Sequence, residues 1–322
     1  AAETQGKTEE PSGPLRASAA LREKNSMLKT LSSTLHSFAD TVTLGRPLAR
    51  ALGLTLAPVT VHRFPDGETL VRVTPAVGSH AFLLRSLQNP NAKLIETLLA
   101  ADALRRAGAQ RVTLIAPYLP YMRQDTVFTP GEPLSQKVIA DCLGRAFDRI
   151  VTIEPHLHRT RQLSDVFPCD AVALSAAPIL AQWIHRTGRR SLVVGPDEES
   201  EPWIRAIAEP AHLPWVVGKK ERLGDHRVRI HFPTLPSCTR AVIVDDIASS
   251  GGTVAVAARA LRRAGVPTVD AAVVHAIFAP GALGRIRTAG IRHLVSCDTI
   301  PHPTNAIRSL PLLVAAMKEM LV

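Results

Sequence analysis

The sequence predicts an α/β protein with two related domains, each a parallel sheet flanked by helices. Three observations favour this fold class: short, nearly continuous apolar runs, helical patterns between them, and one motif that occurs twice. Apolar runs that do not alternate with polar residues are typical of parallel strands covered on both faces. Strands that alternate with helices along the chain indicate βαβ units and an open parallel sheet.

The alternating pattern of strands and helices is expected from about residue 31, and the candidate elements stand from residue 81 onward. Strands are expected at 81–86, 111–117, 149–155, 191–196, 215–219, 240–246, 269–278 and 293–298. Helices are expected at 91–109, 134–147, 177–187 and 253–266. The repeated motif ALRRAG stands at 103–108 and 260–265, and in both copies its glycine lies where a helix would end before the next strand. Coincidence is the alternative, but we favour two related domains, at 31–174 and 175–322.

Composition and charge narrow the class of protein. A chain of 322 residues is long enough for about two domains. Its net charge of +10 suits phosphorylated small molecules or nucleic acid, or it marks only a solvated surface. The 13 aromatic residues (8 Phe, 3 Trp and 2 Tyr) are too few, and the basic residues too scattered, to favour nucleic acid. Residues 1–30 lack Ile, Val and aromatics, and are expected to be a disordered tail or a fusion remnant.

The cellular location is expected to be the cytoplasm. No apolar run approaches the roughly 18 residues of a membrane-spanning helix, and the start of the chain has no signal-peptide core. The four cysteines are widely spaced and form no CxxC pair, so a zinc or redox site is not expected. Partners in the membrane or among nucleic acids are likewise not expected.

The segment AVIVDDIASSGGTVAVAARAL, at 241–261, carries most of the chemical information. Its apolar strand leads into a loop that contains Ser249, Ser250, Gly251, Gly252 and Thr253, and a helical pattern follows. The glycines let backbone N–H groups approach an anion, and the helix N-terminus presents unpaired donors and positive charge. The hydroxyls add further donors, so the loop is predicted to bind phosphate.

The paired carboxylates at the end of this strand, Asp245 and Asp246, would repel a phosphate. They fit the same site if they accept hydrogen bonds from ribose hydroxyls or help to hold a cation. The loop is neither a GxGxxG dinucleotide motif nor a GxxxxGK[ST] loop. The alternative is an ordinary strand, turn and helix with an acidic strand end.

This loop resembles the phosphoribosyl-diphosphate motif of the type I phosphoribosyltransferase fold. Five more segments narrow the resemblance to the ribose-phosphate pyrophosphokinase (phosphoribosyl-diphosphate synthetase) family: RFPDGE (63–68), PYLPYMRQD (117–125), EPH (154–156), GPD (195–197) and KER (220–222). They occur in the family's order and cover the chain from about residue 40 to its end. The resemblance implies two phosphoribosyltransferase-like domains. It also implies transfer of a diphosphoryl group from ATP to the 1-hydroxyl of ribose 5-phosphate, which gives phosphoribosyl diphosphate and AMP.

The resemblance also implies a role for each matching residue. Ribose 5-phosphate would be bound by Asp245, Asp246, Ser249, Ser250, Gly251, Gly252 and Thr253. ATP would be bound by Phe64, Asp66, Glu68, Arg123, Gln124 and Asp125. Magnesium, the expected cofactor, would be held by His156 and Asp197, and catalysis would fall to Lys220 and Arg222, with Lys219 as the alternative to Lys220. The first three ATP residues form a hairpin that serves a neighbouring subunit in the family, so a homo-oligomer, dimeric or larger, is expected.

Each of these segments has a plainer interpretation when taken alone. RFPDGE fits an Asp-Gly turn between strands, and Arg123 fits a solvated loop arginine. His156 fits a structural histidine, and the basic stretch around Lys220 fits a surface turn. The chemistry nevertheless agrees with the implied roles, because an arginine fork suits phosphate oxygens and cations stabilise a migrating diphosphoryl group.

Four departures from the family pattern indicate a divergent branch. Ser249 stands where many members carry an acid, and Glu154 stands where Asp is usual. GPD is followed by EESEPW, and residues 126–133 lack the basic residues that many members have. The last difference argues against the common bacterial control by phosphate or nucleotide. A non-catalytic regulatory homologue and a phosphoribosyltransferase therefore stay open as alternatives.

Overall fold

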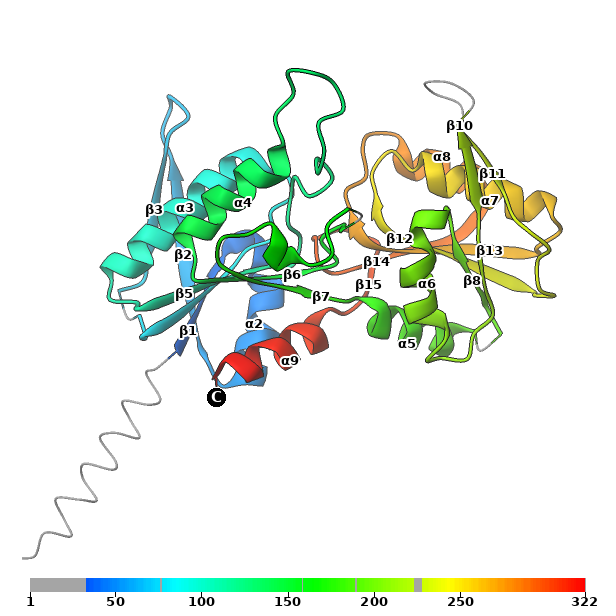
Figure 1. Cartoon of the computed structure of the whole chain (residues 1–322). Coiled ribbons are helices and arrows are strands. Elements are labelled where there is room, and N and C mark those ends of the chain that lie inside the picture. Colours follow the sequence, from blue (N-terminus) through cyan, green and yellow to red (C-terminus); the bar gives the residue numbers. More distant parts are fainter. Residues whose placement is uncertain (1–32, 76, 158, 189, 223–227, 322) are drawn as a thin grey trace, which may run out of the picture.

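Two sheets lie side by side, each with helices above and below it, in the computed structural model, which describes residues 33–75, 77–157, 159–188, 190–222 and 228–321 (Figure 1). The first sheet has the order β3-β2-β1-β4-β5-β6-β7, and only the β2–β3 pairing is antiparallel. Its strands are β1 (Ser33–Phe38), β2 (Thr55–Arg63), β3 (Thr69–Val73), β4 (His80–Leu84), β5 (Arg111–Ala116), β6 (Arg149–Ile153) and β7 (Asp170–Leu174).

The second sheet is parallel throughout and has the order β15-β14-β13-β12-β8-β9. Its strands are β8 (Leu192–Gly195), β9 (Trp215–Val217), β12 (Arg240–Ala248), β13 (Thr268–Ala276), β14 (Ile291–Cys297) and β15 (Asn305–Ile307). A separate antiparallel pair, β10 (Lys219–Arg222) and β11 (Val228–His231), stands beside this sheet. The helices are α2 (Val42–Leu52), α3 (Pro90–Arg106), α4 (Ser135–Ala146), α5 (Ala177–Thr187), α6 (Glu201–Ala208), α7 (Gly252–Arg263), α8 (Ala282–Thr288) and α9 (Leu310–Leu321).

The predicted fold class, two parallel-sheet α/β domains, is confirmed. All eight expected strands and all four expected helices are present, most within two or three residues of their expected bounds. Strand β12 continues to Ala248, two residues past its expected end, so the Asp245–Asp246 pair lies inside the strand rather than at its very end. The expected tail, residues 1–30, lies outside the described residues.

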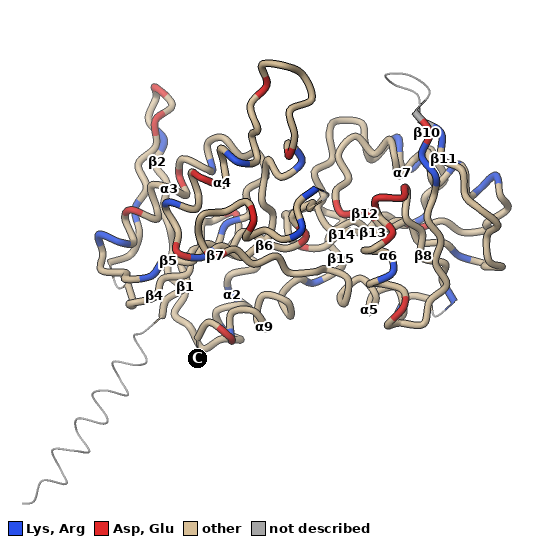
Figure 2. The backbone as a smooth tube through the Cα atoms, in the orientation of Figure 1, with Lys and Arg blue, Asp and Glu red and all other residues tan. Residues whose placement is uncertain are grey.

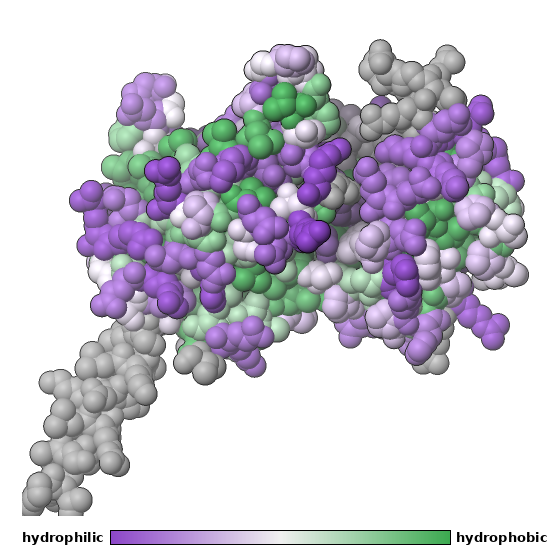
Figure 3. Space-filling model, in the orientation of Figure 1, coloured by the Kyte–Doolittle hydropathy of each residue, from purple (hydrophilic) through white to green (hydrophobic). Residues whose placement is uncertain are grey.

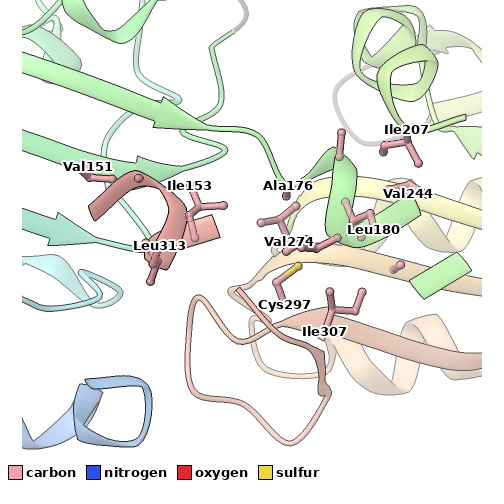
Figure 4. Packing of buried hydrophobic residues seen from close by; sticks show 14 of the residues in the cluster. Val151, Ile153, Ala176, Leu180, Ile207, Val244, Val274, Cys297, Ile307 and Leu313 are labelled. Carbon is pink, nitrogen blue, oxygen red and sulfur yellow. The ribbon is translucent and has the colours of Figure 1, made fainter. Parts of the chain in front are cut away.

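One hydrophobic cluster joins the two sheets (Figure 4). It includes Val151 and Ile153 from β6, Val274 from β13 and Leu313 from α9, each at most 1% exposed. Burying a leucine side chain of this kind contributes about 1.5–3 kcal/mol, so the interface between the sheets is a true core. Among the described residues, no helix is both long enough and apolar enough to cross a membrane.

The chain crosses from one sheet to the other and back. Leu174, the proposed domain boundary, is the last residue of β7 in the first sheet. Helix α9, at the far end of the chain, packs against α2 beneath the first sheet rather than beside the second (Figure 1). The proposed C-terminal domain, 175–322, therefore ends in a helix whose partner belongs to the first domain.

Candidate active site

The site lies in a cavity of about 600 Å³ between the two domains. Its walls come from the loop after β5, the loop after β6, the segment after β8, strand β10 and the end of β12. Ligands bind at the carboxyl ends of strands in open α/β sheets, and this cavity occupies such a position. Figure 2 shows acidic positions gathered beside β12 and α6. Seven of the predicted site residues line the cavity: Arg123, His156, Asp197, Lys220, Asp245, Asp246 and Thr253.

The predicted phosphate loop connects β12 to α7. Gly251 precedes the helix with φ +70°, a left-handed conformation that side chains rarely adopt. A Cβ on Gly251 would also lie 2.8 Å from Ile286 Cδ1, so only glycine fits there. The first backbone N–H groups of α7 and the hydroxyl of Thr253 are placed to receive an anion. Ser249, Ser250, Gly251 and Gly252 flank this helix start without lining the cavity themselves.

The acidic pair on β12 is held in place by backbone hydrogen bonds. The N–H of Asp246 donates to Asp245 Oδ1 at 3.1 Å, and the N–H of Ile247 donates to Asp246 Oδ1 at 2.7 Å. Burial raises the pKa of Asp245 well above its usual value, and the nearby Asp246 and Asp197 carboxylates raise it further. Negative charge therefore converges here, and a bound cation would relieve it.

His156 connects the first domain to this acidic pair. Its Nδ1 lies 2.5 Å from Asp246 Oδ2. Two residues of its loop, Glu154 and His156, have φ values of +42° and +59°, which is unusual for residues other than glycine. Burial raises the pKa of the Glu154 carboxyl, which accepts a hydrogen bond from the N–H of Ala176 at 2.7 Å.

The carboxylates suit magnesium, which prefers oxygen ligands. Within the described parts of the chain, no group of three or more His, Cys, Asp or Glu side chains forms a ready metal cage. Mg²⁺ commonly binds through one or two carboxylates and the phosphates of a substrate, so the carboxylates that line this cavity fit that ion without forming a complete cage.

The two predicted catalytic cations come from β10. Lys220 lines the cavity, and its Nζ lies 3.3 Å from Asp197 Oδ2. Lys219 is exposed and does not line the cavity, because neighbouring residues of a strand point to opposite sides. The backbone of Arg222 pairs with that of Val228, but its side chain lies outside the described residues, as does segment 223–227.

The predicted ATP residues of the RQD segment point to different places. Arg123 lines the main cavity and also a neighbouring cavity of about 530 Å³, which Gln124 lines as well. Asp125 is instead held by Arg159, whose Nη1 lies 2.8 Å from Asp125 Oδ1. Asp125 therefore supports a cavity-lining arginine rather than facing the cavity itself.

The predicted adenine hairpin is distant from this chain's own cavity. Phe64, Asp66 and Glu68 lie in the turn between β2 and β3, at the opposite end of the first sheet from β6 and β7 (Figure 1). The N–H of Glu68 donates to Asp66 Oδ1 at 3.0 Å, which fixes the turn. Phe64 is 40% exposed, so its ring faces solvent instead of the core.

Eight residues that line the cavity were missing from the predicted site. Four of them have side chains with charged or ring N–H groups: Glu154, Arg159, Glu199 and Trp203; the others are Leu157, Ser200, Pro202 and Ile247. Glu154 stood out only as a departure from the family pattern, and Glu199 and Trp203 lie in the EESEPW segment, which begins at Glu198 and departs in the same way. These departures were the signal that could have found them. Arg159 carried no signal, because a single loop arginine is usually solvated.

Comparison with known proteins decides the family. Residues 34–146 match the family described as the N-terminal domain of ribose phosphate pyrophosphokinase, and residues 174–288 match the phosphoribosyl transferase domain. A ribose-phosphate pyrophosphokinase of Methanopyrus kandleri is 35% identical over 286 residues, which cover 88% of this chain and 97% of that protein. This chain belongs to the ribose-phosphate pyrophosphokinase family. The family resemblance predicted from the sequence is confirmed.

Other ribose-phosphate pyrophosphokinases agree with this assignment. The enzyme of Thermococcus kodakarensis is 34% identical over 264 residues, covering 81% of this chain and 92% of that protein. The crystal structure of phosphoribosylpyrophosphate synthetase from Mycobacterium smegmatis matches with a TM-score of 0.77 at 26% identity, and covers 90% of this chain and 98% of that chain. The ribose-phosphate pyrophosphokinase fold therefore extends over nearly the whole chain.

Proposed function

We propose that this chain is a magnesium-dependent ribose-phosphate diphosphokinase. It would transfer the diphosphoryl group of ATP to the 1-hydroxyl of ribose 5-phosphate, giving phosphoribosyl diphosphate and AMP. The observation that supports this proposal most directly is the composition of one cavity. A helix N-terminus with Thr253, the acidic pair Asp245–Asp246, and the cations Lys220 and Arg123 all border it.

Ribose 5-phosphate would occupy the part of the cavity next to β12. Thr253 and the helix N-terminus would receive the 5-phosphate, together with the loop from Ser249 to Gly252. Asp245 and Asp246 lie on β12, before this loop, where they can accept hydrogen bonds from ribose hydroxyls. In this arrangement the 1-hydroxyl would be directed toward the centre of the cavity.

ATP would lie across the two cavities that share Arg123 and Ile247. Arg123 and Lys220 would bind the phosphates, and Gln124 would contact the nucleotide in the second cavity. Catalysis of this kind depends on positioning and on neutralising charge in the transition state, and both cations are placed for it. Arg222 is proposed to act with Lys220 because both belong to the KER segment.

Magnesium would neutralise phosphate charge and align the two substrates when bound. His156 and Asp197 are proposed to hold it, with the Asp245–Asp246 pair close by. Two contacts support this proposal: His156 reaches across the domain interface to within 2.5 Å of Asp246, and Asp197 is held by Lys220 beside the same cavity.

The adenine ring is proposed to be bound by the hairpin of a second copy. Phe64, Asp66 and Glu68 are remote from the cavity of their own chain, and the ring of Phe64 is exposed. The hairpin adjoins an apolar surface formed by Leu70, Ile95, Leu99 and Val138, which are 41%, 56%, 43% and 56% exposed. Figure 3 shows hydrophobic residues on this part of the first domain. An exposed apolar surface of this kind marks a protein contact.

The proposed reaction is tested by following both products. The protein is incubated with ribose 5-phosphate, Mg²⁺ and ATP labelled at its β-phosphorus. AMP and labelled phosphoribosyl diphosphate are the expected products, formed in equal amounts. ADP as the product would contradict the proposal, and no turnover at any phosphate or metal concentration would favour the non-catalytic homologue.

A further inference from the structure

A buried histidine on the second domain holds the loop that carries His156. His275 lies on β13 and is 1% exposed. Its Nε2 lies 3.0 Å from the carbonyl oxygen of Ile153 and 3.1 Å from that of Glu154, both at the end of β6 in the first domain. Carbonyl oxygens only accept hydrogen bonds, so Nε2 carries the proton.

The other ring nitrogen is fixed by a threonine. Nδ1 of His275 lies 2.9 Å from Thr299 Oγ1, which donates to it or to the carbonyl of Val274. Burial lowers the pKa of His275 to about 4, so the ring stays neutral at physiological pH and keeps one donor and one acceptor. Both the orientation and the tautomer of the ring are thereby defined.

The loop that His275 contacts has an unfavourable backbone conformation, which the hydrogen bonds from His275 help to hold. Glu154 and His156 adopt left-handed backbone conformations, each of which costs of order 1–3 kcal/mol for a residue other than glycine. Glu154 is held on three sides: its N–H donates to Leu174 O at 3.0 Å, its carboxylate accepts from Ala176, and its carbonyl accepts from His275. Only the last of these contacts comes from a strand of the opposite sheet.

We propose that His275 is a positioning residue, whose Nε2–H fixes the left-handed turn at Glu154 and so directs His156 at Asp246. The metal-binding part of this inference rests on the proposed function of His156, but the hold on the loop does not. The competing interpretation is a core histidine that serves stability alone. Substitutions that place a polar atom near only one of the two ring-nitrogen positions separate the two interpretations.

His275→Gln places an amide N–H near the position of Nε2, whereas His275→Asn places its polar atoms near Nδ1 only. Both variants are polar and similarly buried, so they differ mainly in the donor to the loop. Two readouts apply to each: amide hydrogen exchange of the peptide covering residues 150–157, and Mn²⁺ affinity measured by electron paramagnetic resonance without turnover. The proposal expects His275→Asn to exchange faster and to bind Mn²⁺ about 10–100-fold more weakly, as outer-shell changes do. His275→Gln should stay within about threefold of the unmodified protein.

Ser86→Ala is the matched control for loss of a contact between the domains. The Ser86 hydroxyl donates to the carbonyl of Thr299, on the far side of the same network, and does not touch the His156 loop. This variant should lower the melting temperature and leave Mn²⁺ affinity and exchange of 150–157 unchanged. If His275→Asn folds poorly, Thr299→Val keeps the imidazole, removes the hydroxyl that contacts Nδ1 and the carbonyl of Val274, and is expected to loosen the loop to a smaller extent.

The positioning role is overturned if His275→Asn matches the unmodified protein in both readouts, or if His275→Gln fails as completely as His275→Asn. His156→Ala separates this result from failure of the proposed function. Unchanged Mn²⁺ affinity in His156→Ala would contradict the metal role of His156. Hydrogen exchange in His275→Asn would still decide whether His275 holds the loop.

Discussion

Lys220 Nζ lies 3.3 Å from Asp197 Oδ2 in the candidate site, and this pair joins β10 to the segment that follows β8. In the absence of phosphate, the lysine thus has a carboxylate partner. A diphosphoryl group that enters the cavity would compete with Asp197 for the ammonium group of Lys220. Lys220 is therefore placed to stabilise the negative charge of that group during its transfer.

Lys220→Ala is expected to lower kcat by about 100–1,000-fold, as loss of one donor to a developing charge does, with the KM for ribose 5-phosphate within about threefold of its original value. Lys219→Ala is the matched control, because Lys219 is exposed and does not line the cavity. This variant should retain nearly full activity. Steady-state kinetics on both variants provide the test. An equal loss of binding and rate in Lys220→Ala would argue against its late role.

Mixing two inactive variants tests whether the hairpin serves a second copy. Phe64→Ala and Lys220→Ala are expected to be weakly active alone, since each lacks one part of every site. When they are coexpressed with different tags, mixed dimers have one intact site, so about a quarter of full activity should return. A mixture of Lys220→Ala with the Phe64→Ala, Lys220→Ala double variant should not recover. Activity that stays at the level of the separate variants would refute the shared site.

Gly251→Ala should damage the phosphate loop and lower stability. The substitution forces alanine into φ +70° and brings its Cβ to 2.8 Å from Ile286, which should cost of order 1–3 kcal/mol or more. The KM for ribose 5-phosphate is expected to rise about tenfold. Gly252→Ala is the control for stability, since its Cβ would meet only Ser250 Oγ, at 3.4 Å. Thermal unfolding of both variants checks this, and equal melting temperatures would disprove the strain at Gly251.

The buried ion pair at Asp270 predicts how stability depends on acid. Burial alone would raise the pKa of Asp270, but hydrogen bonds from Arg292 and Arg240 outweigh it and hold the pKa below its usual value of 3.8. A carboxyl with a lowered pKa stabilises the fold at neutral pH, and that stability is lost as acid protonates it. Asp270→Asn should therefore lower the free energy of unfolding by about 3–5 kcal/mol at pH 7 and flatten its decline below pH 4.

Denaturant titrations between pH 3 and pH 7 measure this effect. Asp170→Asn is the control, because Asp170 pairs with Arg149 at the surface with 48% of its side chain exposed. Such a pair contributes about 0–1 kcal/mol. If Asp270→Asn were as stable as Asp170→Asn at neutral pH, the network around Asp270 would not make the expected contribution to the free energy of unfolding.

Most elements with a clear apolar run or helical period could be predicted from the sequence, although the apolar helix α9 was missed. Strand β13 is buried along almost its whole length and is bounded by turns, so its pattern is plain. Strand β2 has exposed residues interleaved with buried Ala57 and Val59, and it contains Pro58, which argues against a strand. Helix α6 was missed because its eight residues are too few for a clear period of 3.6.

The candidate site divides in the same way. Residues at strand ends, such as Asp197 and Asp245, could be placed together from the sequence because the carboxyl ends of parallel strands meet at one edge. Asp125 could not be placed correctly, since its capture by Arg159 depends on a contact between two loops. His275 carried no signal either, because its partners lie on a different sheet, 122 and 121 residues earlier in the chain.

The packing of α9 against α2 means that the two halves of the molecule are not separable parts. Leu313 and Met317 of α9 are fully buried, and much of what covers them, such as Leu48 of α2, comes from the opposite end of the polypeptide. Cutting the chain after Leu174 would expose the hydrophobic face of α2 on the first fragment. On the second fragment, α9 would lose the helix against which it packs. The two domains are therefore joined by a shared core as well as by the chain, and neither sheet with its helices is complete without the other half.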